Sequence, residues 1–130
     1  MKQIKRLKRE KVSLFLAAAV LSLGILSGCG GESKEAKEAR MTGIEQLNAG
    51  NYQDAIDSFG KALDESDGIV NSFELDVLKY RGEAEYKLAD YKAAAQTYGI
   101  LAEVDGGKAE YLYYKAVSYT HLRAHETCAD

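Results

Sequence analysis

The chain of 130 residues contains no proline and only two cysteines. Proline is the residue least compatible with a helix interior, and alanine, leucine, glutamate and lysine are plentiful from Lys34 onward, so the composition predicts an all-helical domain. Two cysteines, Cys29 and Cys128, do not provide a disulfide framework. Folding must therefore depend on the packing of helices against one another.

Residues that usually carry catalysis are also scarce. The sequence has no glycine-rich phosphate loop, no Cys-x-x-Cys pair, no nucleophile elbow and no histidine-based triad. Its two histidines, His121 and His125, are spaced as in helical zinc motifs, but Leu122 stands where those motifs have a glutamate. We therefore predict that the chain is not an enzyme and that it binds no metal and no cofactor.

Basic charge is concentrated at the N-terminus. Residues 1–28 hold one acidic residue and six basic ones, which are Lys2, Lys5, Arg6, Lys8, Arg9 and Lys11. Since the whole chain carries a formal net charge of −3, residues 29–130 carry −8. An acidic domain of this kind is poorly suited to bind nucleic acid or to make a broad electrostatic contact with anionic lipids.

An apolar run follows the basic residues and ends near a cysteine. The run from Val12 to Ile25 has about the length of the hydrophobic part of a secretory signal, and a spanning helix needs about 20 apolar residues. The next four residues resemble the lipobox of bacterial lipoproteins: Leu26, Ser27, Gly28 and Cys29. The alternative is an uncleaved signal anchor with an incidental cysteine.

The lipobox resemblance implies where the protein is located. In lipoproteins the signal peptide, here residues 1–28, is removed and the thiol of the new first residue, here Cys29, carries diacylglycerol. Two or more acyl chains give stable membrane anchoring. The resemblance implies a lipid-anchored protein on the extracytoplasmic face of a bacterial membrane, which is the cell membrane or, if the host is Gram-negative, alternatively the outer membrane. Residues 29–33 would then be the lipidated cysteine and a short tether.

A pattern of small and aromatic residues recurs within residues 34–116. Gly43, Gly50, Tyr52, Ala55, Phe59 and Ala62 correspond, 39 positions later, to Gly82, Ala89, Tyr91, Ala94, Tyr98 and Leu101. At a shift of 34, Leu78, Tyr80, Arg81 and Gly82 correspond to Leu112, Tyr114, Lys115 and Ala116. The pattern resembles the tetratricopeptide repeat (TPR), a helix-turn-helix unit of about 34 residues. The resemblance implies a TPR-like helical solenoid of two repeats and the start of a third, and a chance amphipathic bundle is the alternative.

Apolar periodicity and end signals predict helices at 34–48, 52–65, 72–88, 91–104 and from 108 onward. Gly43 and Gly82 lie inside helices, where glycine costs about 1 kcal/mol relative to alanine, so we expect close helix contacts there. Gly50 is expected to end the first helix in a left-handed conformation. Asn51 and Asp90 are candidates to cap the helices that follow them.

The TPR resemblance also implies a binding surface. In such solenoids the first helix of each unit lines a concave face that takes an extended peptide or a partner helix. The family's groove positions include the candidate binding residues Lys37, Arg40, Asn48, Lys79, Tyr86, Lys87 and Tyr113. The basic residues among them would favour an acidic segment or a peptide carboxylate. The alternative is that they are ordinary solvated side chains.

Three tyrosines cluster at the start of the third repeat: Tyr111, Tyr113 and Tyr114. Aromatic side chains often carry the binding energy of an interface. In a solenoid, however, Tyr114 should pack on the preceding helix. We therefore expect a core role to outweigh a ligand-binding role in this cluster.

Together these patterns predict a membrane-anchored, extracytoplasmic lipoprotein that acts as a protein-protein interaction scaffold. Its partners would be the membrane, through the lipid anchor, and a protein or peptide, with no nucleic acid and no metal. Two alternatives stay open. One is a passive spacer or envelope-assembly component without its own peptide groove, and the other is the N-terminal part of a longer protein with a catalytic domain.

Residues 117–130 are interpreted as a non-native tail. Residues 117–126 match one translated frame of a transposase-based sequencing adapter, GTC TCT TAT ACA CAT CTC CGA GCC CAC GAG, and the bases that follow begin the codon of Thr127. We expect the natural sequence to depart from this chain near Ala116. Because both histidines lie in the tail, the helical zinc spacing would then have no biological meaning.

Overall fold

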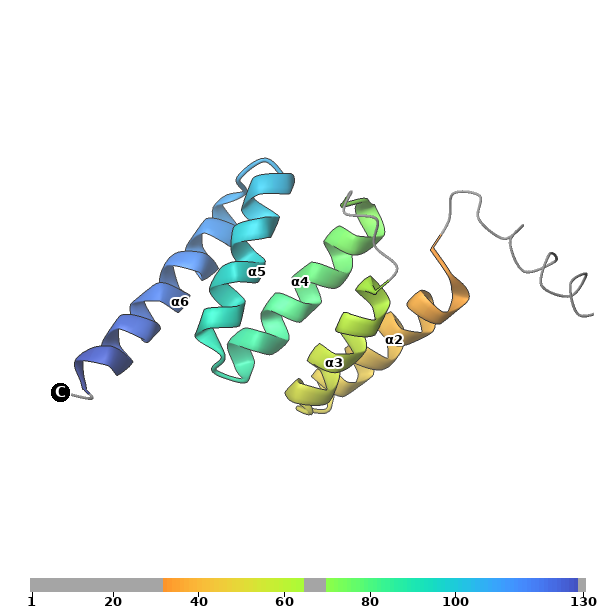
Figure 1. The fold of residues 1–130 in the computed structure, drawn as a ribbon, viewed down its shortest axis with the longest axis horizontal. Coiled ribbons are helices and arrows are strands. Elements are labelled where there is room, and N and C mark those ends of the chain that lie inside the picture. Colours follow the sequence, from red (N-terminus) through yellow and green to blue (C-terminus); the bar gives the residue numbers. More distant parts are fainter. Residues whose placement is uncertain (1–31, 65–69, 129–130) are drawn as a thin grey trace, which may run out of the picture. The chain divides into compact units, whose positions relative to one another are not determined.

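A computed structural model describes residues 32–64 and 70–128, and within these ranges it contains helices and no strand. The helices are α2 (Lys34–Asn48), α3 (Tyr52–Leu63), α4 (Ser72–Lys87), α5 (Tyr91–Val104) and α6 (Ala109–Thr127), shown in Figure 1. The all-helical prediction is confirmed, and the predicted helix ends lie within two residues of those observed. The signal peptide, the lipobox and the tether up to residue 31 lie outside the described residues.

Short polar side chains begin three of these helices. Ser33 caps α2 and Asp90 caps α5, each by accepting a hydrogen bond from the backbone amide three residues later. At the start of α4, Asn71 and Glu74 form a reciprocal capping box that we did not predict. Asn51, in contrast, makes no capping hydrogen bond with its side chain. Of the two caps expected for α3 and α5, only Asp90 is confirmed.

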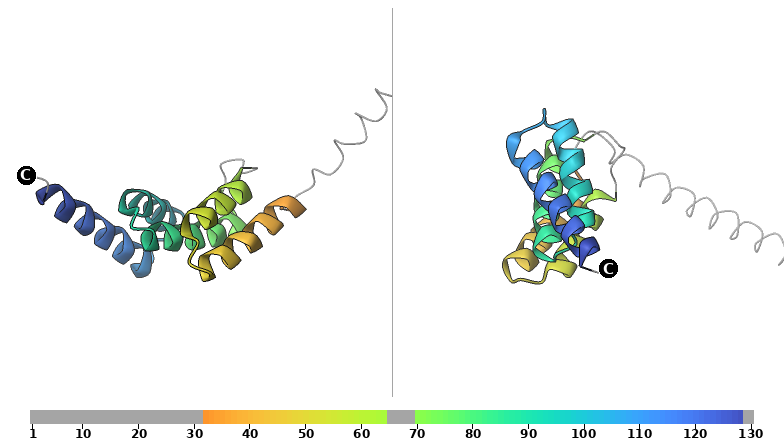
Figure 2. Two further views of the ribbon diagram at one scale, coloured as in Figure 1. Left: turned by 90° about the horizontal axis from the view of Figure 1, so that it is seen from below. Right: turned by 90° about the vertical axis from the view of Figure 1, so that its left-hand side faces the viewer.

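Each helix packs against the next helix in the chain, and α2 also contacts α4. As a result α3 lies against both α2 and α4, while α5 lies against both α4 and α6. The helices thus form two layers, with α2, α4 and α6 in one layer and α3 and α5 in the other (Figure 2). The layer of α2, α4 and α6 holds all the helices on which candidate binding residues were predicted.

Two glycines allow close contacts inside the helix pairs. A Cβ atom at Gly43 would lie 2.6 Å from Cε1 of Phe59, and one at Gly82 would lie 3.1 Å from Cζ of Tyr98. The rings of Phe59 and Tyr98 are both buried. The expected close approach of helices at Gly43 and Gly82 is therefore confirmed. Gly50 has a φ of +81°, which confirms its left-handed conformation at the end of α2.

The apolar core has two clusters that share α4. The first lies among α2, α3 and α4 and contains Leu47, Ala55, Phe59, Ala62, Val77 and Ala84. The second lies among α4, α5 and α6 and contains Leu78, Ala94, Tyr98, Leu101 and Tyr111. Because Val77 and Leu78 are neighbours on α4 and belong to different clusters, this helix joins the two parts of the core.

α6 continues through the adapter-like residues 117–127. Ser118 is fully buried and its hydroxyl donates a hydrogen bond to the carbonyl oxygen of Tyr114 at 2.7 Å. The ring of His121 stacks on Tyr91 with ring centroids 4.3 Å apart. The non-native origin of these residues stays a prediction, and we assign no function to them.

Candidate functional site

A cavity of about 420 Å³ lies between α4 and α6. α4 contributes one face of its helix, because each of its lining residues lies three or four positions from a lining residue on the next turn. α5 contributes a single side chain, and α6 contributes three from its first two turns. The lining residues are Asp76, Lys79, Tyr80, Glu83, Tyr86, Lys87, Tyr98, Glu110, Tyr111 and Tyr114. All of them precede the adapter-like tail.

Aromatic rings make up much of the cavity wall, since five of the nine tyrosines line it. Tyr98 and Tyr114 stack with ring centroids 4.9 Å apart, and Tyr86 meets Tyr114 edge-on at 5.6 Å. Such ring pairs contribute about 0.5–1.5 kcal/mol each beyond the area they bury. They connect α4, α5 and α6, and the expectation that Tyr114 packs on the preceding helix is confirmed.

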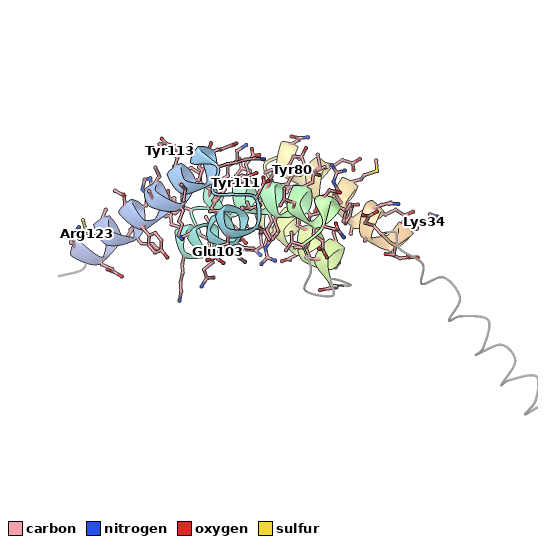
Figure 3. All side chains as sticks on the ribbon, turned by 90° about the horizontal axis from the view of Figure 1, so that it is seen from above. Lys34, Tyr80, Glu103, Tyr111, Tyr113 and Arg123 are labelled. Atoms are coloured by element: carbon pink, nitrogen blue, oxygen red, sulfur yellow. The ribbon has the colours of Figure 1, made fainter. Side chains whose placement is uncertain are left out.

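The hydroxyl group of Tyr111 forms a polar contact with the loop that precedes α6. Its hydroxyl donates a hydrogen bond to Oδ2 of Asp105 at 2.8 Å, and Nζ of Lys108 donates to the same oxygen at 2.6 Å. These two hydrogen bonds lower the pKa of Asp105. Burial, followed by the hydrogen bond to Asp105, raises the pKa of Tyr111. In Figure 3, Tyr80 and Tyr111 lie toward one side of the helical domain and Glu103 lies toward the other.

Two of the three lining carboxylates have a basic partner. Nε of Arg40 donates a hydrogen bond to Oδ2 of Asp76 at 2.7 Å. Nζ of Lys87 lies 2.8 Å from Oε1 of Glu83, and its hydrogen bond to that carboxylate raises the pKa of Lys87. The third carboxylate, that of Glu110, has no ion-pair partner among residues 32–64 and 70–128.

Three of the seven candidate binding residues line this cavity, namely Lys79, Tyr86 and Lys87. The other four lie elsewhere: Lys37 and Asn48 are exposed on α2, Arg40 contacts Asp76, and Tyr113 is 63% exposed on α6. Of the four basic candidates, Lys79 and Lys87 line the cavity, whereas Lys37 and Arg40 do not. Arg40, Lys87 and also Lys37, at 3.8 Å from Glu32, each have a carboxylate partner.

Tyr111 and Tyr114 line the cavity, whereas the TPR resemblance implied that Tyr113 would lie in the groove. Residues three apart share a helix face, whereas a neighbouring residue is turned away by about 100°. The spacing of Tyr111 and Tyr114 could therefore have identified the pair, but not the direction in which it points. Tyr98 was missed because its repeat position assigns it to the core of a helix pair, where Phe59 is its counterpart.

No protein-family model, no curated protein and no solved structure matches the chain. None of the helices in the described part of the chain is long and apolar enough to cross a membrane. In that same part, no three histidine, cysteine, aspartate or glutamate side chains are grouped so that they could hold a metal ion. The cavity between α4 and α6 is thus the candidate site on which a function can be argued.

Proposed function

We propose that this protein is a bacterial lipoprotein, held at the extracytoplasmic face of a membrane by a lipid on Cys29. The support is the order of segments at the N-terminus: six basic residues, a short apolar run, and the Leu-Ser-Gly-Cys tetrad that ends at Cys29. Because residues 29–130 carry −8, acyl chains and not a basic surface would provide the attachment.

We further propose that the helical domain is a TPR-like solenoid. Its support is a contact that recurs at the 39-residue shift of the sequence pattern. The hydroxyl of Ser58 donates a hydrogen bond to Oε1 of Gln46 at 2.6 Å, and the hydroxyl of Thr97 donates one to Oε2 of Glu85, also at 2.6 Å. Equivalent residues thus join equivalent helices, as tandem repeats of one unit would.

On this scaffold, the function supported best is the binding of a partner protein or peptide. The observation that carries it is the cavity between α4 and α6, the first helices of two successive repeats in the proposed solenoid. Its tyrosines combine apolar area with hydroxyl groups, which is typical of binding surfaces. A passive spacer would not need such a cavity, and this favours the scaffold over that alternative.

The lipid anchor can be tested by metabolic labelling with an alkyne analogue of palmitate in a bacterial host. We expect the wild-type chain to be labelled and recovered with membranes, and Cys29→Ser to be neither labelled nor cleaved. Cys128, which is exposed, provides a matched control, because Cys128→Ser should keep the label. An unlabelled wild-type chain, or equal labelling of Cys29→Ser, would refute the anchor.

The binding function can be tested with a photo-crosslinking amino acid at one of two exposed lysines. Lys87 lines the cavity, whereas Lys92 on α5 does not. We expect the Lys87 position to give a discrete, saturable crosslinked product in cells and the Lys92 position to give none. Equal products from both positions, or no product from Lys87, would contradict a binding role for the cavity.

A further inference from the structure

The residues that line the cavity provide little unpaired positive charge for the acidic ligand that the basic candidates suggested. Among the lining residues, three are carboxylates and two are lysines. Lys87 is already paired with Glu83, and Nζ of Lys79 lies 6.0 Å from the centroid of the Tyr111 ring. An acidic ligand would therefore have to compete with Glu83 for Lys87, which leaves Lys79 as its main attraction.

Carboxylates from two helices line the cavity together with Tyr98. Glu83 lies on α4, Glu110 on α6 and Tyr98 on α5, and both carboxylates oppose the ionisation of Tyr98. The pKa of Tyr98 is raised well above its ordinary value, with burial as the largest cause and these charges adding to it. A positive group placed beside Tyr98 would be stabilised by the same field.

The tyrosine rings add a second attraction for a positive group. Ring faces carry negative charge density, and a cation within about 6 Å of a ring centroid is attracted to it. Lys79 and Arg40 make such contacts at 6.0 Å from Tyr111 and 5.7 Å from Tyr80. Two of the rings that line the cavity, Tyr80 and Tyr111, thus already contact cationic groups of the protein itself.

We propose that the cavity between α4 and α6 binds an arginine or lysine side chain of an extended partner peptide, with the cationic group beside Tyr98 and between Glu83 and Glu110. This inference rests on the proposed binding function and names the chemistry of its ligand. Glu110 is the one lining carboxylate that forms no ion pair within residues 32–64 and 70–128. A volume of about 420 Å³ is within the usual range of ligand sites and accommodates one such long side chain.

Three labelled peptides of about eight residues provide the test, identical except for two central positions that carry arginine, glutamate or glutamine. Binding to the full chain in a non-ionic detergent is measured by fluorescence polarisation at about 0.15 M salt, where exposed charges are largely screened beyond about 8 Å. We expect the arginine peptide to bind most tightly, by about tenfold over the glutamate peptide. Tighter binding of the glutamate peptide would overturn the inference.

Two substitutions that make the same change of charge show whether the peptide is attracted by the cavity or by the domain as a whole. Glu110→Lys should weaken binding of the arginine peptide about tenfold, and Glu103→Lys, on an exposed part of α5 outside the cavity, by less than about threefold. Equal losses would show attraction by the domain as a whole and would overturn the site. Both side chains are exposed, so circular dichroism should show unchanged helix content.

A substitution that is expected to strengthen binding gives a result that a loss of folding could not produce. Lys79→Glu should increase affinity for the arginine peptide, because it removes a competing cation from the cavity. Weaker arginine binding by Lys79→Glu, together with a retained Lys87 photo-crosslink, would leave the proposed binding function intact but overturn the basic-ligand inference. Failure of the Lys87 photo-crosslink would instead overturn the binding function itself.

Discussion

The first helix pair, α2 and α3, and the second, α4 and α5, follow one plan with different chemistry. Where the first pair has Phe59, the second has Tyr98, and where the first has the neutral Gln46, the second has the buried Glu85. Both aromatic rings pack beside a helix glycine, and both polar residues accept a hydrogen bond from the partner helix. The second pair thus has a phenol where the first has a phenyl ring, and a carboxylate where the first has a neutral amide.

Phe59 and Tyr98 also differ in the contacts that surround them. On the side of α2, Arg40 bridges to α4 through Asp76 and covers the ring of Tyr80, and Phe59 stacks against the same ring at 6.1 Å. On the side of α6, no such bridge is present among the described residues, and Tyr98 lines the cavity instead. At this repeat position Phe59 therefore belongs to the core alone, whereas Tyr98 belongs to the core and also lines the cavity.

The largest effect on the free energy of unfolding is expected at the charged contact between Arg81 and Glu85, which only the second pair has. Glu85 is 1% exposed and accepts hydrogen bonds from Nε of Arg81 at 2.8 Å and from the hydroxyl of Thr97. Arg81→Met leaves this carboxylate buried without a cation, which should lower the free energy of unfolding by about 2–3 kcal/mol. Urea-induced unfolding followed by circular dichroism measures the change.

A double variant checks the cause of that loss. Arg81→Met combined with Glu85→Gln gives the second pair the neutral hydrogen bond that the first pair makes with Gln46. It should recover most of the lost stability, because replacing both partners of an ion pair is far less costly than removing one. If the double variant were as unstable as the single one, the comparison between the two pairs would fail at this contact.

The next largest effect concerns the glycines beside the two rings. At Gly43 a Cβ would lie 2.6 Å from the fully buried Phe59, so Gly43→Ala should lower the free energy of unfolding by about 1–2 kcal/mol despite the higher helix propensity of alanine. At Gly82 the nearest atom is 3.1 Å away, and we expect a change within about 1 kcal/mol. Gly60→Ala is the matched control on α3, because nothing lies within 4 Å of its Cβ. Equal stability of Gly43→Ala and Gly60→Ala would contradict the close contact.

A smaller effect is expected where α2 and α4 end. Gly50 and Ala89 occupy the same repeat position and both have positive φ, +81° and +64°. This conformation costs a residue with a Cβ about 1–2 kcal/mol. Ala89→Gly should therefore raise the free energy of unfolding by about 0.5–1 kcal/mol, and Gly50→Ala should lower it by a similar amount. Thermal unfolding of the two variants should show shifts of opposite sign, and shifts of the same sign would contradict their equivalence.

Helix positions could be predicted from the sequence because their signals are local. Asp90 and Gly50 act on backbone groups within a few residues, and the close contacts at Gly43 and Gly82 follow from glycine inside a helix pattern. The caps at Ser33 and Asn71 were equally local and were overlooked. Such features need no knowledge of the tertiary arrangement.

The composition of the cavity could be predicted only in part. Lys79, Tyr86 and Lys87 lie on one face of a single helix, so their repeat positions were sufficient to bring them together. The contact of Arg40 could not be predicted, because its partner, Asp76, is 36 residues away and on another helix. Whether a side chain lines a cavity or bridges two helices depends on the spacing between helices, which no local pattern records.

At neutral pH the smallest effect on the free energy of unfolding is expected for Tyr98→Phe, which gives the second pair the same ring as the first. Burial is the main cause of the raised pKa of Tyr98, followed by Tyr114, Glu83, Glu110 and Glu85. In the unfolded chain a tyrosine ionises near pH 10, whereas in the folded chain Tyr98 still holds its proton there. Its contribution is therefore fully present below about pH 10 and is lost as the pH rises from there toward the higher pKa of the folded state.

The alkaline unfolding profile separates Tyr98 from the other tyrosines. Wild-type protein should lose stability above about pH 10, and Tyr98→Phe should lose less because phenylalanine has no proton to release. Tyr113→Phe, at a ring that is 63% exposed, is the matched control and should follow the wild-type profile. If Tyr98→Phe followed it as well, Tyr98 would not be protected by its surroundings, and the polar character of the second helix pair would have no measurable consequence at this position.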